Sequence, residues 1–474
     1  MRILLTGATG YIGKRLLPAL VNQGHEVICC VRDANRFNPP KQLLPHTEIV
    51  EVDFLDKATL QNIPDNIDAA YYLIHSMSGA SGKFNELESE SAHNFNEAVA
   101  GKKIEQVIYL SGIVNEETLS KHLASRKEVE NILSQGDFAL TTLRAGIIVG
   151  SGSASFEIIR DLVEKLPVMI TPRWLNTRCQ PIGITDVILF LSSVLHNKAT
   201  YNDNYDIGGP DVLTYKEMLL GFARARKLKR WIFTLPIMTP KLSSYWLFFV
   251  TSTSYRLAVT LVDSMKVEVV CSDDRLAKLL GIKTISYAES LAKAFSKINQ
   301  HVVPSSWKDS LVSGRISENL SEYIEVPVYG CLQDKRSVKV KDSEKVLDRI
   351  WALGGETGWY YGNWLWKLRG FLDKLSGGVG LRRGRTNIND INAGDSLDFW
   401  RVLYANRAEK RLLLFAEMKV PGEAWLEFRI DDGVLCQTAT FRPRGLWGRL
   451  YWYSIFPIHG FVFGGMLREL NKTK

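Results

Sequence analysis

The chain has 474 residues, of which 46% are hydrophobic and 23% charged, as expected for a globular protein of two or three domains. Its formal net charge of +8 is not gathered in a basic helix or a finger motif, which disfavours nucleic acid as a partner. The six cysteines form no CxxC pair and no Cys/His spacing, so we expect no metal site and a reducing compartment.

The first residues are typical of a strand, a glycine turn and a helix. Residues 3–5 suit a buried parallel strand, and helical periodicity extends over residues 11–20. Glycines between these elements let backbone N–H groups approach a pyrophosphate, which then rests on the positive end of the helix. We therefore predict that the GxxGxxG turn binds a dinucleotide through Gly7, Ala8, Thr9, Gly10, Tyr11, Ile12 and Gly13.

The end of the second predicted strand, residues 26–31, indicates which dinucleotide binds. Folds that prefer NAD place an acid there, whereas an arginine accommodates the 2′-phosphate of NADP. Arg32 follows the strand, and Asp33 should point to the other side. We expect NADP(H) as the cofactor and NAD(H) as the lesser option. The alternative is that Arg32 is a solvated loop residue.

Strands continue to alternate with helices up to residue 111. Residues 49–54, 69–74 and 106–111 are predicted strands, and residues 84–100 are a predicted helix. This order predicts an α/β fold with a Rossmann-type, doubly wound parallel sheet and a ligand at the carboxyl ends of the strands. There we expect the cofactor to contact Asp53 and Phe54, on either side of the adenine, and Leu73, Ile74 and His75.

Four segments carry a resemblance to a known family: TGATGYIG, VDFLD, VIYLSG and LRAGIIVG. They resemble the atypical branch of the short-chain dehydrogenase/reductases, a group of NmrA-like, epimerase-like and isoflavone-reductase-like proteins. The resemblance covers residues 1–298 and implies an NAD(P)-binding domain with a substrate lid. It also implies that Ser111 lies beside the nicotinamide and that a Tyr-x-x-x-Lys pair follows on the next helix.

His122 and Arg126 stand at the spacing of that pair, eleven residues past Ser111. Both share a helical stripe with the apolar residues 129 and 133, so we expect them to face into the fold. Arg126 can hold a ribose through its fixed charge and fork of donors. A cation beside His122 disfavours the imidazolium form, and neutral imidazole is a weak proton donor. We predict Ser111, His122 and Arg126 as the catalytic set, with Arg126 also contacting the cofactor; a solvated helix face is the alternative.

The resemblance places the substrate after the sixth predicted strand, residues 139–143. The segments 169–175 and 235–250 are apolar and aromatic, and no charged cluster suggests a nucleotide-sugar phosphate. We therefore expect a reductase of a bulky apolar molecule, such as a quinone or a lipid. A non-catalytic, NADP(H)-responsive regulator and a lipid carrier are the alternatives. The predicted substrate contacts are Arg144, Phe156, Arg173 and Trp174.

A second domain follows a linker predicted at residues 299–322, where Pro, Ser and Gly interrupt the periodicity. Residues 323–474 are expected to form an α+β helix-grip domain, with a helix over residues 343–353 and a long C-terminal helix. Its antiparallel strands are SLDFWRVLYAN, RLLLFAEMKV, AWLEFRIDD and GVLCQTATFRP, the last two joined by a hairpin at residues 432–433.

Motifs in this second half carry a further resemblance. Residues 354–385, together with DFWRV, PGEAWLEF and FRPRGLWGRLYWY, resemble the domain of unknown function 2867. With the first half, they make the chain similar to uncharacterised bacterial proteins that fuse this domain to an NAD(P)-binding domain. The resemblance implies kinship with Bet v 1/START-like folds, which bind hydrophobic ligands. The oligomeric state is left open.

The segment 450–467 suggests contact with a membrane. It has 18 residues, no formal charge and six aromatic side chains, and arginines bracket it. A proline, a histidine and three glycines disfavour a spanning helix, so we expect peripheral contact with an anionic membrane. The arginines at 382–385 could add a second contact. A helix packed on its own sheet is the alternative. Glycines break the first apolar run, so we expect no signal peptide and a cytoplasmic protein, with the inner face of the cytoplasmic membrane as the surface it contacts.

Overall fold

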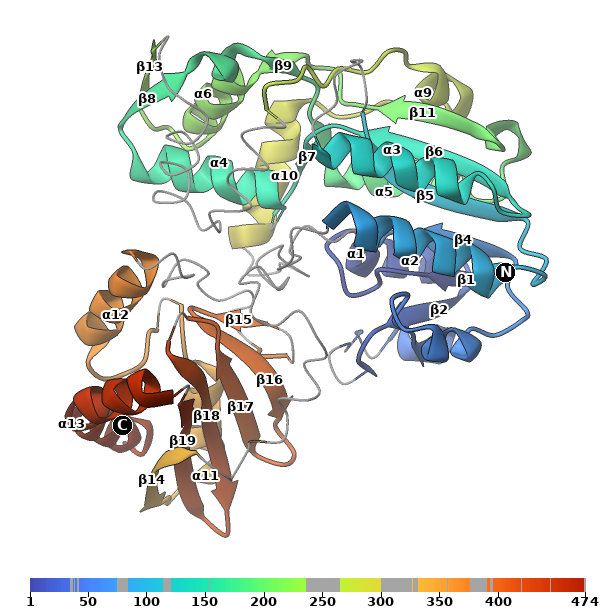
Figure 1. Ribbon diagram of the computed structural model, residues 1–474. Helices are drawn as coiled ribbons and strands as arrows, with labels where there is room; N and C mark the ends of the chain where they lie inside the picture. Colours follow the sequence, from blue (N-terminus) through green and yellow to red (C-terminus); the bar gives the residue numbers. More distant parts are fainter. Residues whose placement is uncertain are drawn as a thin grey trace. The chain divides into compact units, whose positions relative to one another are not determined.

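The chain divides into two compact units, Met1–Trp307 and Lys308–Lys474, each with its own sheet (Figure 1). The boundary falls within residues 299–322, but the bounds of the linker stay a prediction because residues 300–325 lie outside the described part. The computed structural model describes residues 1–34, 37, 39–40, 42–74, 84–113, 121–151, 153–235, 265–299, 326, 331–355, 357–375, 390–392, 395–418, 420–443 and 445–472.

The first unit is built on a seven-stranded sheet in the order β11-β6-β5-β4-β1-β2-β3, and all its pairs are parallel. This order confirms the predicted Rossmann-type, doubly wound sheet. The third predicted strand ends three residues early, at Glu51. The strands are β1 (Arg2–Leu5), β2 (Glu26–Val31), β3 (Thr47–Glu51), β4 (Ala69–Tyr72), β5 (Gln106–Gly112), β6 (Ala139–Ala145) and β11 (Asp203–Ile207).

Helices cover both faces of this sheet, which explains why its strands are continuous apolar runs. Alternate residues of β1 point to opposite layers: Ile3 and Leu5 pack with α1 (Gly13–Asn22) and α5 (Ile184–Ser193). Leu4 packs with α2 (Phe84–Val99) and α3 (Lys121–Leu133). The first helix begins two residues later than predicted, because residues 11 and 12 still belong to the glycine turn.

The rest of the first unit forms a smaller layer around a cluster of phenylalanines. The Phe156, Phe222 and Phe295 rings lie 5.1–5.6 Å apart between α4, α6 and α10. The elements are β7 (Ile148–Val149), α4 (Ala154–Lys165), β8 (Val168–Pro172), the 3-10 turn η4 (Arg173–Asn176), β9 (Arg178–Cys179), β10 (Ile182–Gly183), β12 (Leu213–Thr214), α6 (Tyr215–Ala225), β13 (Trp231–Leu235), α9 (Arg275–Leu280) and α10 (Tyr287–Asn299).

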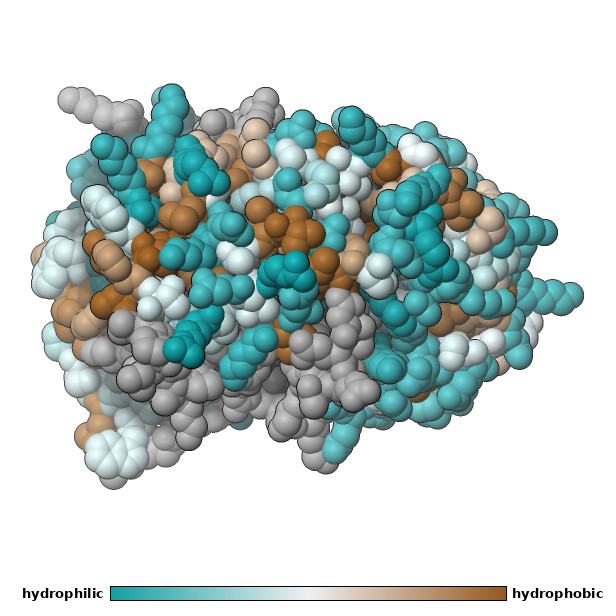
Figure 2. Space-filling model, turned by 90° about the horizontal axis from the view of Figure 1, so that it is seen from above, coloured by the Kyte–Doolittle hydropathy of each residue, from teal (hydrophilic) through white to brown (hydrophobic). Residues whose placement is uncertain are grey.

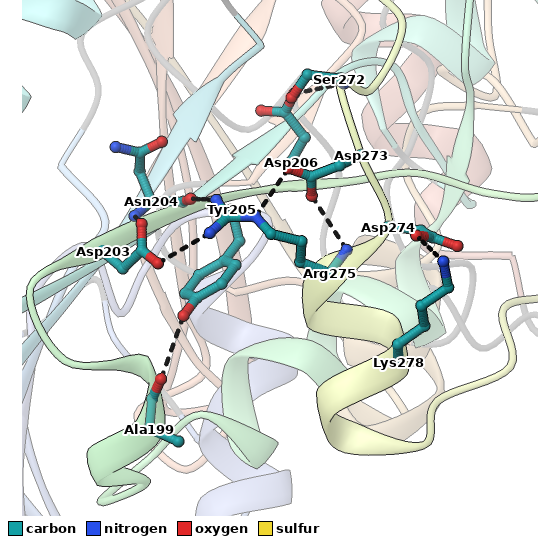
Figure 3. A network of polar contacts seen from close by, with 10 residues as sticks. All are labelled: Ala199, Asp203, Asn204, Tyr205, Asp206, Ser272, Asp273, Asp274, Arg275 and Lys278. Carbon is teal, nitrogen blue, oxygen red and sulfur yellow. Dashed lines mark hydrogen bonds and ion pairs between the residues drawn. The ribbon is translucent and has the colours of Figure 1, made fainter.

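A polar network holds the segment before α9 against β11, at the edge of the sheet (Figure 3). Arg275 bonds to the Asp203 carboxylate at 3.1 Å and to the Asp273 carboxylate at 2.8 Å. The backbone N–H and the hydroxyl of Ser272 donate to Asp206 at 2.8 and 2.7 Å. The network therefore anchors the segment that follows the undescribed residues 236–264 to the main sheet.

The second unit is an antiparallel sheet with helices, in the order β14-β19-β18-β17-β16-β15 (Figure 1). Asp432 and Gly433 both have positive φ, as the predicted hairpin requires. Three of the four predicted strands are present, and a turn at residues 398–399 divides the first into β15 and β16, which pair with each other. The kinship with START-like folds stays a prediction. The elements are β14 (Leu332–Lys339), α11 (Ser343–Trp351), α12 (Asn363–Leu375), β15 (Ser396–Leu397), β16 (Trp400–Asn406), β17 (Arg411–Ala416), β18 (Gly422–Asp431), β19 (Val434–Pro443) and α13 (Gly445–Leu470).

Candidate functional site

The glycine turn between β1 and α1 is too tightly packed to accept side chains. Gly7 has a φ of +67°, and a Cβ there would lie 2.6 Å from the carbonyl oxygen of Leu73. A Cβ on Gly13 would lie 2.3 Å from the carbonyl oxygen of Gly7. The turn therefore rests on the chain beyond β4 and aims the positive end of α1 at the carboxyl edge of the sheet, which fits a dinucleotide pyrophosphate.

Tyr11 and Arg15 connect this turn to the chain beyond β7. The Arg15 guanidinium lies 3.9 Å from the centre of the Tyr11 ring and donates to the Tyr11 carbonyl at 3.0 Å. It also donates to the carbonyl of Ser151 at 2.8 Å. Sequence reasoning missed Arg15. The i, i+4 spacing of the pair was a weak signal, but the contact with Ser151 depends on the fold.

The two residues after β2 lie in opposite environments. Arg32 is exposed and Asp33 is buried, as the alternation along the strand predicts. Glu51, at the end of β3, accepts from the backbone N–H of Ala34 at 2.7 Å and fixes the turn that follows. The Arg32 side chain is therefore in solvent, at the carboxyl edge of the sheet where the glycine turn also lies.

The structure separates the predicted adenine contacts, Asp53 and Phe54. Asp53 is half-buried, and its carboxylate accepts from the Leu55 N–H at 3.0 Å. Phe54 is buried, and its ring lies 5.7 Å from that of Phe95 in α2. The Phe54 ring thus belongs to the core beneath the sheet, and only Asp53 has surface to offer at the edge.

The chain beyond β4 passes directly over the glycine turn. The Thr6 hydroxyl donates to the Tyr71 carbonyl and accepts from the Leu73 N–H, each at 3.0 Å. This holds Leu73 and Ile74, both half-buried, at the carboxyl edge of the sheet. His75 lies outside the described residues.

Arg126 is held at the end of β5, beside Ser111. Its guanidinium donates to the Leu110 carbonyl at 3.2 Å, and its own carbonyl accepts from the Tyr109 hydroxyl at 3.4 Å. Ser111 is buried on the same strand. The backbone of His122 lies in the first turn of α3, and its side chain lies outside the described part. The structure thus brings Ser111 and Arg126 to one strand end, as predicted.

Two buried features fix the surroundings of Arg126. The hydroxyl of Ser125 bonds to the buried Glu88 carboxylate of α2 at 2.5 Å, which sets α3 against α2. Burial raises the pKa of Tyr109 to about 12, so this phenol is a poor proton donor at neutral pH.

The four predicted substrate residues fall into two pairs. Arg144 forms a two-pronged ion pair with Glu130 of α3, with N···O distances of 2.6 and 3.2 Å. Phe156 is fully buried in the phenylalanine cluster. Arg173 is exposed and Trp174 half-buried, and both lie in η4. Phe156 therefore has no surface for a ligand, and the partly exposed guanidinium of Arg144 is already paired with Glu130.

Strands β8 and β13 expose an apolar ladder next to η4. Val168 pairs with Trp231, and Ile170 with Phe233, and all four side chains are about half exposed. Figure 2 looks down on this end of the first unit and shows hydrophobic side chains among hydrophilic ones. β8 runs directly into η4, but Trp174 packs against the core cluster that contains Met169, on the face of β8 opposite the ladder.

No metal site is found among the described residues, since no three His, Cys, Asp or Glu side chains there gather in a group that could hold an ion. The six cysteines are free thiols.

Two families match the chain, one in each unit. Residues 7–163 match a family described as NAD(P)H-binding, and residues 331–466 match one described as a protein of unknown function, DUF2867. The chain joins an NAD(P)H-binding domain to a DUF2867 domain. Both resemblances seen in the sequence are thereby confirmed.

Known proteins similar to the first unit include reductases. Divinyl chlorophyllide a 8-vinyl-reductase of Arabidopsis thaliana is 24% identical over 229 residues, which cover 44% of this chain and 54% of that protein. The match thus spans about half of that relative. Triphenylmethane reductase of Citrobacter sp. is similar in structure, with 17% identity and a TM-score of 0.51 over 62% of this chain and all of the other.

A Staphylococcus aureus nucleoside-diphosphate-sugar epimerase gives a TM-score of 0.50 at 15% identity, over 61% of this chain and 99% of its own. At such identities, both structures show the fold alone. The NAD(P)H-binding domain therefore has a reductase- or epimerase-like fold, and its substrate must be argued from its own residues.

Proposed function

We propose that the protein is an NADP(H)-dependent reductase of a bulky apolar molecule. The observation that carries this proposal is the position of the Arg126 guanidinium. It lies at the end of β5 beside Ser111, on the edge of the sheet where the glycine turn begins α1. A cation at this place can hold the nicotinamide ribose, as the family resemblance implies.

Each residue of the edge has a role in this proposal. The backbone of the glycine turn and the positive end of α1 bind the pyrophosphate. Arg32 pairs with the 2′-phosphate, and Arg126 donates to the ribose hydroxyls. NADPH supplies a hydride when bound. The Ser111 hydroxyl donates a hydrogen bond to the substrate atom on which charge develops.

The proposed substrate is apolar because of the surface around η4. Trp174 and the ladder of β8 and β13 present aromatic and aliphatic side chains, and Arg173 is the only charged side chain in η4. Apolar walls with few polar groups are typical of sites for hydrophobic ligands. Two of the similar proteins, a reductase of divinyl chlorophyllide and one of triphenylmethane dyes, agree with this proposal.

A second candidate is an NADP(H)-responsive regulator without catalysis. It is favoured by His122, which stands where the resemblance implies a tyrosine. Tyr109, the tyrosine that bonds to the Arg126 backbone, is buried and cannot replace the missing acid.

Turnover separates the two candidates. The nucleotide that copurifies with the protein would be identified first, and NADPH oxidation would then be measured against a panel of quinones and enones. Steady oxidation with any of them supports the reductase. Tight NADPH binding without turnover across the panel would favour the regulator.

Arg126→Ala tests the cofactor contact within this proposal. Losing charge-assisted hydrogen bonds costs about 1.5–3 kcal/mol, so the affinity for NADPH should fall roughly 10- to 100-fold. His122→Ala should have a smaller effect on affinity. Lys127→Ala, which removes an exposed positive charge from the neighbouring position, is the control and should leave binding unchanged. Equal, negligible effects of both test variants would make this stretch an ordinary helix face.

A further inference from the structure

Helices α12 and α13 lie side by side in the second unit (Figure 1). The Arg369 guanidinium of α12 donates to the Tyr451 hydroxyl of α13 at 2.8 Å. The Trp366 and Phe463 rings, 6.2 Å apart, join the two helices in the core. One side of each helix is thus committed to the core of the unit.

The other sides of both helices expose large apolar side chains. On α12 these side chains recur at i, i+4, i+7 and i+8, which places them on one stripe. On α13 they occupy its first two-thirds. We call these ten side chains the apolar face; they are 44–78% exposed and comprise Trp364, Leu368, Phe371, Leu372, Trp447, Leu450, Tyr453, Phe456, Ile458 and Phe461. Soluble proteins rarely leave so many large apolar groups together in water without a partner.

The charges beside the apolar face are positive. Lys367 and Arg449 are exposed on α12 and α13, whereas the Asp373 carboxylate of α12 is buried. Arg449 is the only charged residue between Gly445 and Met466, because burial lowers the pKa of His459 to about 3 and keeps its ring neutral. An exposed apolar surface beside cations fits a partner that is both apolar and anionic.

These features distinguish a membrane surface from a second copy of the chain. In a symmetric pair of copies, the same patch would meet itself and bring like charges together. A spanning segment is also disfavoured, because no helix among the described residues is long and apolar enough to cross a membrane. Moreover, Trp452, Val462 and Phe463 of α13 are buried in the core of the unit.

We propose that the apolar face docks in the plane of an anionic lipid bilayer. Trp364, Trp447 and Phe371 enter the headgroup region, which suits amphipathic and aromatic rings, while Lys367 and Arg449 pair with lipid phosphates. The arginines at 382–385, which the sequence suggested as a second contact, lie outside the described residues.

Co-sedimentation of the full chain with lipid vesicles tests the proposal. The vesicles are phosphatidylcholine with or without phosphatidylserine, at low and at high salt. We expect binding that requires phosphatidylserine and is released by salt. No binding at low salt would overturn the proposal, and attachment that survives a carbonate wash would show insertion across the bilayer instead.

Two double variants locate the contact. Phe371→Glu with Trp447→Glu should weaken vesicle binding at least tenfold, since both side chains are more than half exposed and not needed by the core. Trp231→Glu with Phe233→Glu changes two aromatics of the first unit that are also more than half exposed, and this variant should bind vesicles as the unchanged protein does. Loss of binding in the second variant alone would move the contact to the first unit and contradict the proposal.

A third double variant isolates the electrostatic contribution to vesicle binding, and two further measurements test whether the variants fold. Lys367→Glu with Arg449→Glu leaves the apolar side chains in place and should abolish the preference for phosphatidylserine. Circular dichroism should remain unchanged in all variants, and NADPH affinity should remain unchanged in the two variants of the second unit. A self-association that the apolar-face variants abolish, measured by sedimentation in the absence of lipid, would assign the face to a second copy.

Discussion

Arg32 and Asp33 illustrate how neighbouring side chains acquire different roles. The backbone alternation at the end of β2 buries the carboxylate and leaves the guanidinium in solvent. An acid that discriminates in favour of NAD must reach the ribose, and Asp33 is buried whereas Arg32 is exposed. The proposed preference for NADP(H) therefore depends on Arg32.

Arg32→Asp should reverse the preference between the two cofactors. Losing one charge-assisted contact with the 2′-phosphate costs about 1.5–3 kcal/mol, so NADPH should bind roughly 10- to 100-fold more weakly while NADH binding changes little. Fluorescence titration measures both affinities. Lys229→Asp makes the same charge change at an exposed position elsewhere and serves as the control. An unchanged ratio of the two affinities would remove Arg32 from the site.

The carboxyl group of Asp398, in the second unit, is buried, which disfavours its ionised form at neutral pH. Burial raises the pKa of its carboxyl group to about 6, although the Trp359 indole N–H donates to it at 2.8 Å. Between the unfolded pKa near 3.8 and the folded value, the folded state binds more protons than the unfolded state. The free energy of unfolding contributed by this group should therefore decrease as the pH rises through about 4 to 6.

Asp398→Asn should abolish this pH dependence. An amide oxygen can still accept from Trp359, and no carboxylate has to be buried. At pH 8 the variant should be more stable than the unchanged protein by up to about 3 kcal/mol, less the cost of losing an acceptor, and the difference should vanish near pH 4. Urea unfolding of both proteins across this range measures it. A difference independent of pH would mean that Asp398 does not titrate in this window.

The β1–α1 connection combines two kinds of glycine. Gly13 is buried, and a side chain there would collide with backbone atoms of Gly7 and Ala8. Gly10 is exposed, and a Cβ there would meet only the Gly7 oxygen, at 3.1 Å. Gly13 therefore serves helix–strand packing, whereas Gly10 leaves room for the proposed ligand.

Gly13→Ala and Gly10→Ala should therefore fail in different ways. Gly13→Ala should lower the free energy of unfolding of the ligand-free protein by about 1–3 kcal/mol, because the added methyl group meets backbone atoms that cannot move aside easily. NADPH binding should weaken as well. Gly10→Ala should leave thermal unfolding nearly unchanged and still weaken NADPH binding at least tenfold. Normal binding by Gly10→Ala would place the pyrophosphate elsewhere.

The two units have separate hydrophobic cores. One core cluster of the first unit extends from Ile3 to Leu276, and the main cluster of the second unit from Val346 to Leu470. Each core is large enough to support a cooperative transition. We therefore expect a cofactor bound to the first unit to raise the stability of that unit.

Calorimetry should therefore show two unfolding transitions, of which NADPH moves only one. At a ligand concentration 100 times the Kd, the first unit should gain about 2.7 kcal/mol of stability. Arg126→Ala should reduce this shift, whereas Asp398→Asn should change only the other transition. A single transition that NADPH moves as a whole would show that the units unfold together.

The sequence predicted the features that depend on local spacing. The apolar runs of β1, β2, β4 and β5 and the glycine turn follow from side-chain periodicity and backbone freedom within a few residues. The hairpin at residues 432–433 follows from the same local rules, because Asp-Gly tolerates positive φ. The edge strand β14 was missed. Its sequence LQDKRSVK is mostly polar, and only its pairing with β19 makes it a strand.

The roles of individual side chains at the site depended on the tertiary structure. Phe54 and Phe156 are of a residue type that often contacts ligands. Helices distant in the sequence pack against both side chains, so they are core residues. The Arg144 guanidinium is paired with the carboxylate of Glu130, fourteen residues earlier, because α3 packs beside β6. Local sequence determines which element forms and where it turns. Whether a polar or aromatic side chain meets a ligand, a counter-ion or the core depends on which distant elements the fold brings against it.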